Sequence, residues 1–203
     1  YILFQPERTV ISYGENIISE ADEIRKQIQT ARTFYEVEKS LVSVFGSRCQ
    51  HFIKYVFDKP EKVLQAASYA RLLSPEEYLQ FKEFFTANNP GCTDTGWLEP
   101  YFMDLVERHL CCGLFSQDLL VSCTDAPDMP YMQDEVQEIG INTLELYREK
   151  GYAAQACFTC LKQMLQNGIC PQWSTSVHNA ASQRLAEKIG FVKYADVITV
   201  SLS

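Results

Sequence analysis

Two cationic side chains and a glycine stand where a strand-like run gives way to a helix. Residues 138–144 end a strand pattern and Tyr152 begins a helical one, with Arg148, Lys150 and Gly151 between them. The first-turn amides of a helix lack internal partners, and the helix dipole places partial positive charge there. Glycine also lets the backbone approach a ligand closely. The segment therefore predicts an anion site whose natural ligand is phosphate.

A plain turn is the alternative to this anion site. Gly151 could only permit a tight connection from strand to helix, and the two cations could simply be solvated. The two common nucleotide-binding patterns, GxxxxGK[ST] and GxGxxG, do not occur here. Residues 148–153 alone leave both interpretations open.

The helix after Gly151 must hold this segment in place. Its apolar residues recur at three- and four-residue spacing to about Gln166, with Cys157 and Cys160 on the buried stripe. This CxxC has no second CxxC and no nearby pair of histidines, which favours buried free thiols over a metal or redox site. We expect no metal, and we expect the helix to pack closely on a sheet at the edge where α/β sheets bind ligands.

The preceding and following segments supply that sheet. From residue 63 onward the patterns predict the order β, α, α, β, β, β, α, β, α, β, which indicates an α/β protein with a mixed sheet. Residues 63–73 predict the first of these strands, and Ser74–Glu77 has the sequence of a helix start. Residues 134–144 predict one continuous strand leading to the anion site.

A domain boundary is expected near residues 58–62, where a proline interrupts the pattern. Residues 1–62 would then form a small N-terminal α/β extension, and residues 63–203 the main domain. In the extension we expect a hairpin around Gly14 and a helix that begins with a Thr33–Glu36 capping box.

The chain is acidic overall. It has 203 residues, 46% of them apolar, and a formal net charge of −8. It lacks a run of lysine and arginine that could follow a phosphate backbone, so we expect no nucleic acid partner. No apolar run approaches the roughly 18 residues of a membrane helix, and the N-terminal residues lack the pattern of a signal peptide. We therefore expect a cytoplasmic protein without a membrane partner, and the acidic surface is compatible with a cationic substrate.

Two motifs resemble one known superfamily. The residues REKGYA at 148–153 match the [RQ]-x-x-G-x-[GA] loop with which GNAT N-acyltransferases bind the pyrophosphate of acyl-CoA. Further along, NAASQRLAEKIGF at 179–191 resembles the GNAT element N-x-x-[AS]-x-x-L-x-x-K-x-G-F. The motifs occur in the expected order, with one helix and one strand between them. Residues 63–203 thus resemble a GNAT N-acetyltransferase, most closely a bacterial branch that carries an N-terminal extension.

The resemblance implies a fold and a co-substrate. The fold would be α/β, with a mixed, mainly antiparallel central sheet flanked by helices, and the co-substrate would be acetyl-CoA. Backbone groups on the strand would pair with the pantetheine arm, the loop would bind the pyrophosphate, and two residues of the later helix would lie near the thioester. These residues are, in that order, Ile141, Asn142 and Thr143; Arg148, Glu149, Lys150, Gly151, Tyr152 and Ala153; and Asn179 and Ser182.

Asn179 also has a structural interpretation. Asparagine is a preferred N-cap residue, and Gly190 stands where the helix after Asn179 should end.

The resemblance also implies catalytic candidates. Glu138 resembles the acidic residue that many GNAT proteins place on this strand, with Glu135 as the alternative and a solvent-facing carboxylate as the competing interpretation. Many members use a tyrosine of the later helix as the acid, where this chain has Ala186. Tyr194, Ser182, a water molecule or direct departure of the thiolate could replace it, since a thiol of pKa about 8.5 is a fair leaving group.

The expected activity is acetyl transfer from acetyl-CoA to the primary amine of a small molecule, by direct attack in a ternary complex. The alternative is a catalytically weak module that senses acyl-CoA or mediates interactions, and the alanine at position 186 keeps it open. Residues 1–62 could shape the acceptor site, support a homodimer or only extend the sheet. The segments 85–101 and 124–134 should form the acceptor pocket, and their aromatic residues could line it or only pack: Trp97, Tyr101, Phe102 and Tyr131.

Overall fold

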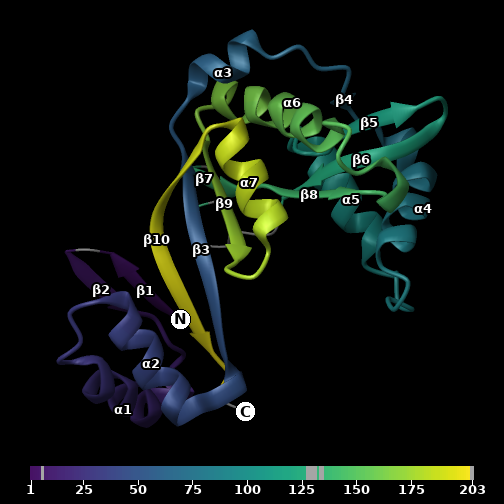
Figure 1. Cartoon of the computed structure of the whole chain (residues 1–203). Coiled ribbons are helices and arrows are strands. Elements are labelled where there is room, and N and C mark those ends of the chain that lie inside the picture. Colours follow the sequence, from purple (N-terminus) through teal and green to yellow (C-terminus); the bar gives the residue numbers. More distant parts are fainter. Residues whose placement is uncertain (6, 127–131, 133–134, 202–203) are drawn as a thin grey trace. The chain divides into compact units, whose positions relative to one another are not determined.

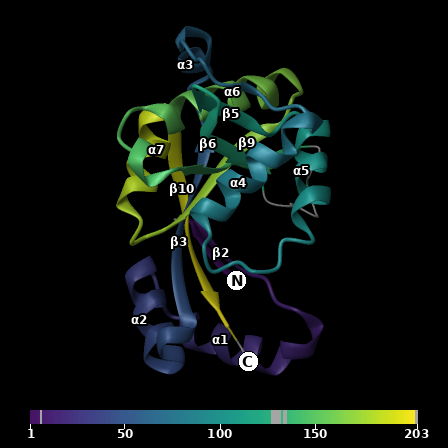
Figure 2. The same cartoon turned by 90° about the vertical axis from the view of Figure 1, so that its right-hand side faces the viewer.

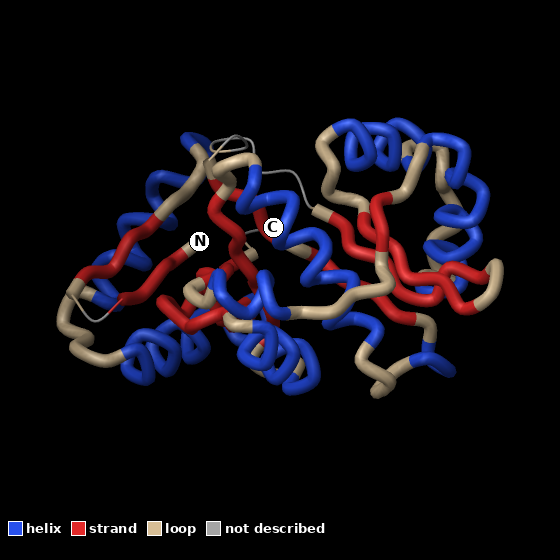
Figure 3. Tube along the Cα trace, turned by 90° about the horizontal axis from the view of Figure 1, so that it is seen from above, coloured by secondary structure: helices blue, strands red, loops and turns tan. Residues whose placement is uncertain are grey.

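The computed structural model describes residues 1–5, 7–126, 132 and 135–201 (Figure 1). Its strands are β1 (Ile2–Gln5), β2 (Arg8–Ile11), β3 (Cys49–Phe57), β4 (Arg71–Leu72), β5 (Cys112–Ser116), β6 (Leu119–Asp125), β7 (Val136–Glu138), β8 (Gly140–Thr143), β9 (Cys170–Ser176) and β10 (Phe191–Val200). Its helices are α1 (Ile18–Ile28), α2 (Phe34–Phe45), α3 (Pro60–Gln65), α4 (Tyr78–Asn88), α5 (Leu98–Glu107), α6 (Tyr152–Gln166) and α7 (Ala180–Ile189). Helices and strands can be followed along the trace in Figure 3, where they are blue and red.

The strands form a mixed, mainly antiparallel arrangement. The described strands pair in the orders β2-β1-β10-β3-β9-β7 and β4-β5-β6-β8. The pairs of β1 with β2 and β10, and of β5 with β4 and β6, are antiparallel, whereas β7 and β9 are parallel. Helices flank these strands, so the predicted α/β fold class is confirmed. No described helix combines the length and apolar character needed to cross a bilayer.

The chain divides into two compact units. The first unit consists of Tyr1–Tyr55, Ser174–Arg184 and Val192–Ser203, and the second of Val56–Trp173 and Leu185–Phe191. Because both units draw on distant parts of the sequence, the strands β3, β9 and β10 and the helix α7 contribute residues to each.

The first unit has its own apolar core. Side chains from β1, α1, α2 and β10 form it: Ile2, Ile24, Ile28, Val37, Leu41 and Ile198. The predicted capping box is confirmed, since Thr33 Oγ1 accepts from the Glu36 amide at 3.3 Å and the Glu36 carboxylate accepts from the Thr33 amide at 3.2 Å.

The hairpin lies elsewhere than predicted. It joins β1 to β2, with Ile2 opposite Ile11 and Gln5 opposite Arg8, and it does not turn at Gly14. Gly14 has φ −78° and ψ 155°, an extended conformation that any residue adopts, and it leads into a short 3-10 turn before α1. The glycine was therefore not the positive-φ corner that a tight hairpin requires.

The second unit holds the elements around the predicted anion site. Helix α6 contacts β5, β6 and β8, and α4 contacts β6. Figures 1 and 2 show α6 along one side of these strands, with α4 and α5 on the other. The strand predicted over residues 63–73 is wrong, because Pro60–Gln65 form α3 and only Arg71–Leu72 form a strand. Pro60 occupies the first turn of α3, where the missing N–H of proline removes no helical hydrogen bond.

Candidate functional site

The predicted continuous strand over residues 134–144 is divided in two. Its first part, β7, pairs in parallel with β9, from Val136 opposite Cys170 to Glu138 opposite Gln172. The amide of Ile139 still donates to the Gln172 carbonyl at 3.0 Å. From Gly140 onward the chain pairs instead with β6, and β8 is the last strand in the order β4-β5-β6-β8. Ile139 is therefore the point at which the chain leaves one strand and joins another.

Among the described strands, this division leaves β8 paired on one side and a sheet edge on the other. The amide of Leu144 donates to the Val121 carbonyl at 2.9 Å, and Asn142 lies opposite Cys123. Hydrogen-bonded and non-hydrogen-bonded pairs alternate along an antiparallel ladder, so the backbone groups of Ile141 and Thr143 point away from β6. In agreement, the Thr143 carbonyl accepts from Arg148 Nε at 3.2 Å.

The edge of β8 leads directly to the start of α6. Gly151 precedes the helix with φ 82°, and Glu149 also has a positive φ of 64°, so the backbone turns sharply before Tyr152. No side chain caps this helix start, and its first turn contains no acidic residue. A Cβ on Gly151 would meet no atom within 4 Å. The start of α6 therefore lacks a side-chain cap, and the space beside Gly151 is open.

Two exposed cations flank that space. Arg148 reaches back to β8, as described, and the Lys150 ammonium lies 5.1 Å from the centre of the Tyr147 ring. Uncapped amides, the positive end of the helix dipole and two cations thus occur within six residues, 148–153, which together can hold a phosphate or pyrophosphate. This arrangement supports the anion site over a plain turn.

The cysteines of α6 lie in the core, as predicted. Ala156, Cys157, Cys160, Leu161 and Met164 are all 0% exposed. Burial raises the pKa of the Cys157 thiol, which keeps it protonated. Among the residues that the structure describes, no three His, Cys, Asp or Glu side chains gather as a metal site would need. The CxxC therefore fixes α6 against the sheet.

The later motif residues belong to the first unit. Asn179 Oδ1 accepts from the Ser182 amide at 3.1 Å, which confirms Asn179 as the N-cap of α7. Tyr194 lies on β10, where it lines a hollow of about 310 Å³ with Gln5, Glu7 and Arg8. The other predicted site residues, from Glu138 to Ala153, belong to the second unit.

The predicted base lies where the strand divides. Glu138 is half-buried at the end of β7, and its carbonyl accepts from Gln137 Nε2 at 3.0 Å. The alternative, Glu135, precedes β7, and its carbonyl accepts from the Cys170 amide at 2.7 Å.

Sequence reasoning missed a second carboxylate at the same place. Asp125 ends β6 opposite Gly140, the first residue of β8. Its carboxylate occupies the position that a side chain on Gly140 would take, since a Cβ there would lie 1.6 Å from Asp125 Oδ1. Burial raises the pKa of this carboxyl group. The only signal in the sequence was an acid placed directly after the apolar run of a strand.

The aromatic residues expected at the acceptor pocket divide into two kinds. Phe102 is 0% exposed and its ring centre lies 4.7 Å from that of Phe81, so it packs in the core. Trp97 is 47% exposed, with its ring 5.7 Å from that of Tyr101. Tyr131 lies outside the described residues.

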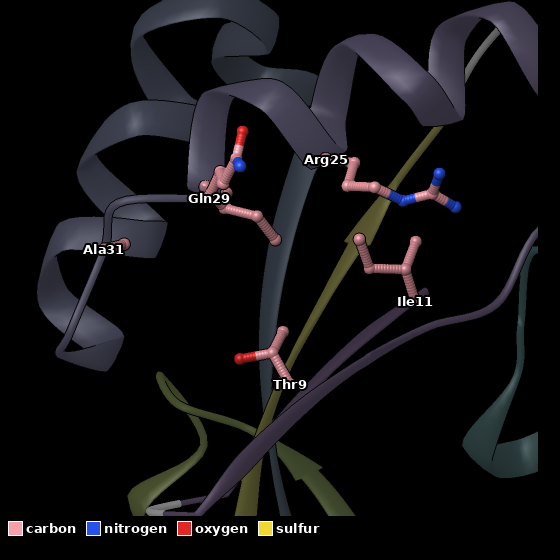
Figure 4. Close-up of a pocket in the computed structure, with 6 residues that line it drawn as sticks. Thr9, Ile11, Arg25, Gln29 and Ala31 are labelled. Carbon is pink, nitrogen blue, oxygen red and sulfur yellow. The ribbon is translucent and has the colours of Figure 1, made fainter.

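The first unit contains a separate cavity of about 420 Å³ between β2 and α1. Figure 4 shows Arg25 and Gln29 on the helix above Ile11 and Thr9 on the strand. Arg25 already pairs with Asp22 at 2.9 Å. The lining residues do not form an acid and base pair, so we place no chemistry in this cavity.

Comparison with known proteins identifies similar chains. Residues 126–197 match the family model described as GNAT acetyltransferase. A GNAT-family acetyltransferase from Colwellia psychrerythraea superposes with a TM-score of 0.67 at 16% identity, covering 97% of this chain and 76% of that chain. A search among curated proteins found no match.

Two further solved structures share the fold. A putative GNAT-family acetyltransferase from Novosphingobium aromaticivorans has a TM-score of 0.56 at 20% identity, covering 77% of this chain and 67% of that chain. The putative acetyltransferase yncA from Salmonella typhimurium, solved with its cofactor acetyl-CoA, has a TM-score of 0.53 at 10% identity, covering 65% of this chain and 94% of that chain. At these identities the likeness concerns the fold.

Proposed function

We propose that this chain, which matches the GNAT acetyltransferase family model over residues 126–197 and shares the fold of GNAT acetyltransferases, is an acetyl-CoA-dependent N-acetyltransferase acting on the primary amine of a small molecule. One observation carries the proposal: the edge of β8 leads into the uncapped start of α6. An extended polar chain that ends in a pyrophosphate requires this sequence of features, because its amides need strand-like partners and its phosphates need N–H donors.

The residues of the second unit would bind the donor in two parts. Ile141 and Thr143 offer backbone groups on the edge of β8, with Asn142 between them directed toward β6. The pyrophosphate would lie at residues 148–153, where Tyr152 and Ala153 contribute helical amides and Gly151 leaves room. Arg148 would exchange its contact with the Thr143 carbonyl for a phosphate oxygen.

The residues proposed from the later motif would act at the thioester. Asn179 and Ser182 keep this role as a proposal, beside the capping bond that joins them. Tyr194 is proposed as the acid that protonates the leaving thiolate, and Glu138 as the base suggested by the sequence resemblance. The acceptor amine must lose a proton before it attacks, so a base near the thioester is required.

The second candidate function is binding without turnover. It is favoured by Ala186, which is buried at 0% exposure and presents a methyl group where many members have a tyrosine hydroxyl. Such a protein would bind acetyl-CoA as a sensor or interaction module. We favour the enzyme, because acidic residues flank the division of the strand: Glu138 ends β7, and Asp125 lies opposite Gly140 at the start of β8.

Calorimetric titration and a thiol-release assay separate these functions. Acetyl-CoA is titrated into the full chain, and CoA release is then followed over a panel of small primary amines. Binding with amine-dependent release supports the acetyltransferase. Tight binding without release on any amine favours the sensor, and absence of binding contradicts both. We further propose a cytoplasmic location and no nucleic acid or membrane partner, and size-exclusion chromatography would test for a homodimer.

A further inference from the structure

We infer that Asp125, in place of Glu138, is the general base of the proposed transfer, taking a proton from a cationic primary amine that is bound on the α5 side of the sheet. The inference rests on the proposed function and assigns a residue and a substrate class to it. Three features of the second unit carry it: the position of Asp125 along the donor path, the face of β6 on which it lies, and its neighbours.

Asp125 lies at the thioester end of the donor path. The pyrophosphate would occupy residues 148–153, and the pantetheine arm would run back along Thr143 and Ile141. The thioester end of the donor would then lie at Gly140, the first residue of β8 after the pairing of β7 with β9 has ended. Asp125 is the residue opposite Gly140 on β6. Its carboxylate lies against the glycine Cα, because no Cβ is present to displace it.

Strand alternation assigns the Asp125 side chain to the face of β6 away from α6, although its charge still reaches Cys157 of that helix. Cys123 shares this face, since it lies two residues before Asp125 on the strand, and its sulfur is 3.6 Å from that of Cys111. The intervening Thr124 pairs with Cys112, whose thiol contacts Cys160 of α6. Residues 148–153, which include the start of α6, thus follow the edge of β8. The Asp125 side chain instead faces α5.

Aromatic side chains from α4 and from the start of α5 form a surface near Asp125. The Tyr101 phenol accepts a hydrogen bond from the Ala126 backbone, directly after Asp125. The Trp97 ring meets Tyr101 edge to face at 5.7 Å, and Phe85 meets Trp97 at 5.5 Å. A carboxylate at the inner end of an aromatic surface attracts an ammonium group through its charge and through the ring faces. The chemistry therefore selects a cationic amine.

The electrostatic surroundings suit a base. Burial raises the pKa of Asp125, and three described titratable groups lie close enough to interact with its charge. These groups are Tyr101 from α5, Cys123 from its own strand and Cys157 from α6, and the pKa of each is raised, first by burial. A carboxylate with a raised pKa accepts a proton from an ammonium group more readily than an exposed one does.

The reaction balances with this single base. The Asp125 carboxylate takes one proton from the ammonium, and the nitrogen lone pair then forms the C–N bond with the acetyl carbon. The electron pair of the C–S bond leaves with sulfur, the proposed acid protonates that thiolate, and the second proton lost by nitrogen restores the acid. The products are the N-acetyl amine, CoA as its thiol, and one proton that Asp125 returns to solvent.

Asp125→Asn tests the assignment in the full chain. Phenethylamine, putrescine and lysine methyl ester serve as acceptor probes, and kcat, KM and the pH profile of kcat/KM are measured. We expect kcat to fall by about 10²-fold or more, as for removal of a general base. The acidic limb of the wild-type pH profile should disappear, while the Kd for acetyl-CoA by calorimetry should stay within about twofold, since the amide is isosteric.

Gly140→Ala provides a second test that keeps the carboxylate. The added methyl group should push the Asp125 side chain away, because it would lie 1.6 Å from Oδ1, and kcat should fall in a folded protein. Gly113→Ala on β5 is the matched control, since the atoms nearest to its Cβ belong to the apolar side chains of Leu120 and Leu73. Asp118→Asn, an exposed acid on the same hairpin, controls for the lost charge.

The outcomes separate this inference from the proposed function. If wild type acetylates a probe and Asp125→Asn keeps its kcat and pH profile, the assignment to Asp125 is wrong while the acetyltransferase stands. If Glu138→Gln loses kcat and Asp125→Asn does not, Glu138 is the general base. If wild type binds acetyl-CoA but acetylates no probe, the proposed function and this inference both fail.

Discussion

In the first unit, Nε2 of His51 lies 2.9 Å from Oδ1 of Asp196 and so joins β3 to β10. The other ring nitrogen, Nδ1, lies 3.1 Å from Glu38 Oε1 on α2, and the Phe34 ring packs on the imidazole with centres 4.4 Å apart. Both ring nitrogens of His51 therefore face an oxygen of an acidic side chain. His51 therefore ties three elements of the unit together and has a structural role.

His51→Gln should destabilise this unit. Glutamine can reach one carboxylate at most, so either Glu38 or Asp196 loses the contact that His51 supplies. We expect a loss of about 1–3 kcal/mol in the free energy of unfolding, measured by urea denaturation. His178→Gln is the control, because His178 is exposed and should tolerate the change. Equal stabilities of the two variants would contradict the structural role.

Gly151→Glu should weaken acetyl-CoA binding at least tenfold by calorimetry. The new carboxylate would stand before the α6 amides and repel the pyrophosphate. Gly168→Glu is a matched control at the other end of α6, because Gly168 has φ 73° against 82° at Gly151 and both have open space around a Cβ. Both variants carry the same charge and similar backbone strain.

The helix dipole sharpens this comparison. Negative charge is favourable at the start of α6 and unfavourable at its end, so Gly151→Glu should be at least as stable as Gly168→Glu. A loss of affinity in the more stable variant cannot be due to unfolding. Unchanged affinity in folded Gly151→Glu would remove the pyrophosphate from this segment.

Asn179→Ala and Asn179→Ser distinguish capping from donor binding. Alanine removes the bond to the Ser182 amide and should lower the free energy of unfolding by about 1 kcal/mol, whereas serine caps nearly as well as asparagine. If the Asn179 amide also contacts the donor, both variants should bind acetyl-CoA more weakly. A serine variant with wild-type Kd would limit Asn179 to its capping role.

Asp125 should make stability depend on pH. Its folded-state pKa is raised by burial, so the folded protein holds this proton more tightly than the unfolded chain does. The contribution is complete below the unfolded pKa of about 3.9 and is lost as pH rises through the folded pKa. Asp125→Asn should therefore gain stability over wild type as pH rises toward neutral, in urea titrations at several pH values. A difference that stays constant with pH would contradict this account.

Local patterns in the sequence predicted the elements that depend on near neighbours. The Thr33–Glu36 capping box, the buried stripe of α6 with Cys157 and Cys160, and the start of α6 at Tyr152 all occur as expected. Each depends on residues within a few positions of one another, where helical periodicity and capping chemistry are decisive.

The features that were missed depend on pairing across the sheet. Residues 134–144 alternate like one strand, and only their partners, β9 and then β6, show that they are two. Asp125 becomes notable only when Gly140 is placed opposite it, because a lone acid after an apolar run has no distinguishing pattern. A strand register is a long-range property, so it does not appear in a local window of sequence.

The single residue between β7 and β8 determines which backbone groups of β8 face the edge that we propose for the donor. β7 is in register with β9 and β8 is in register with β6, so Ile139 must bridge the two ladders with one residue. Inserting or deleting a residue there would leave β7 unchanged but turn the backbone groups of Ile141 inward and those of Asn142 outward. Side chains along this segment can vary, but its length cannot, and spacing is therefore the quantity that relatives sharing the site must preserve.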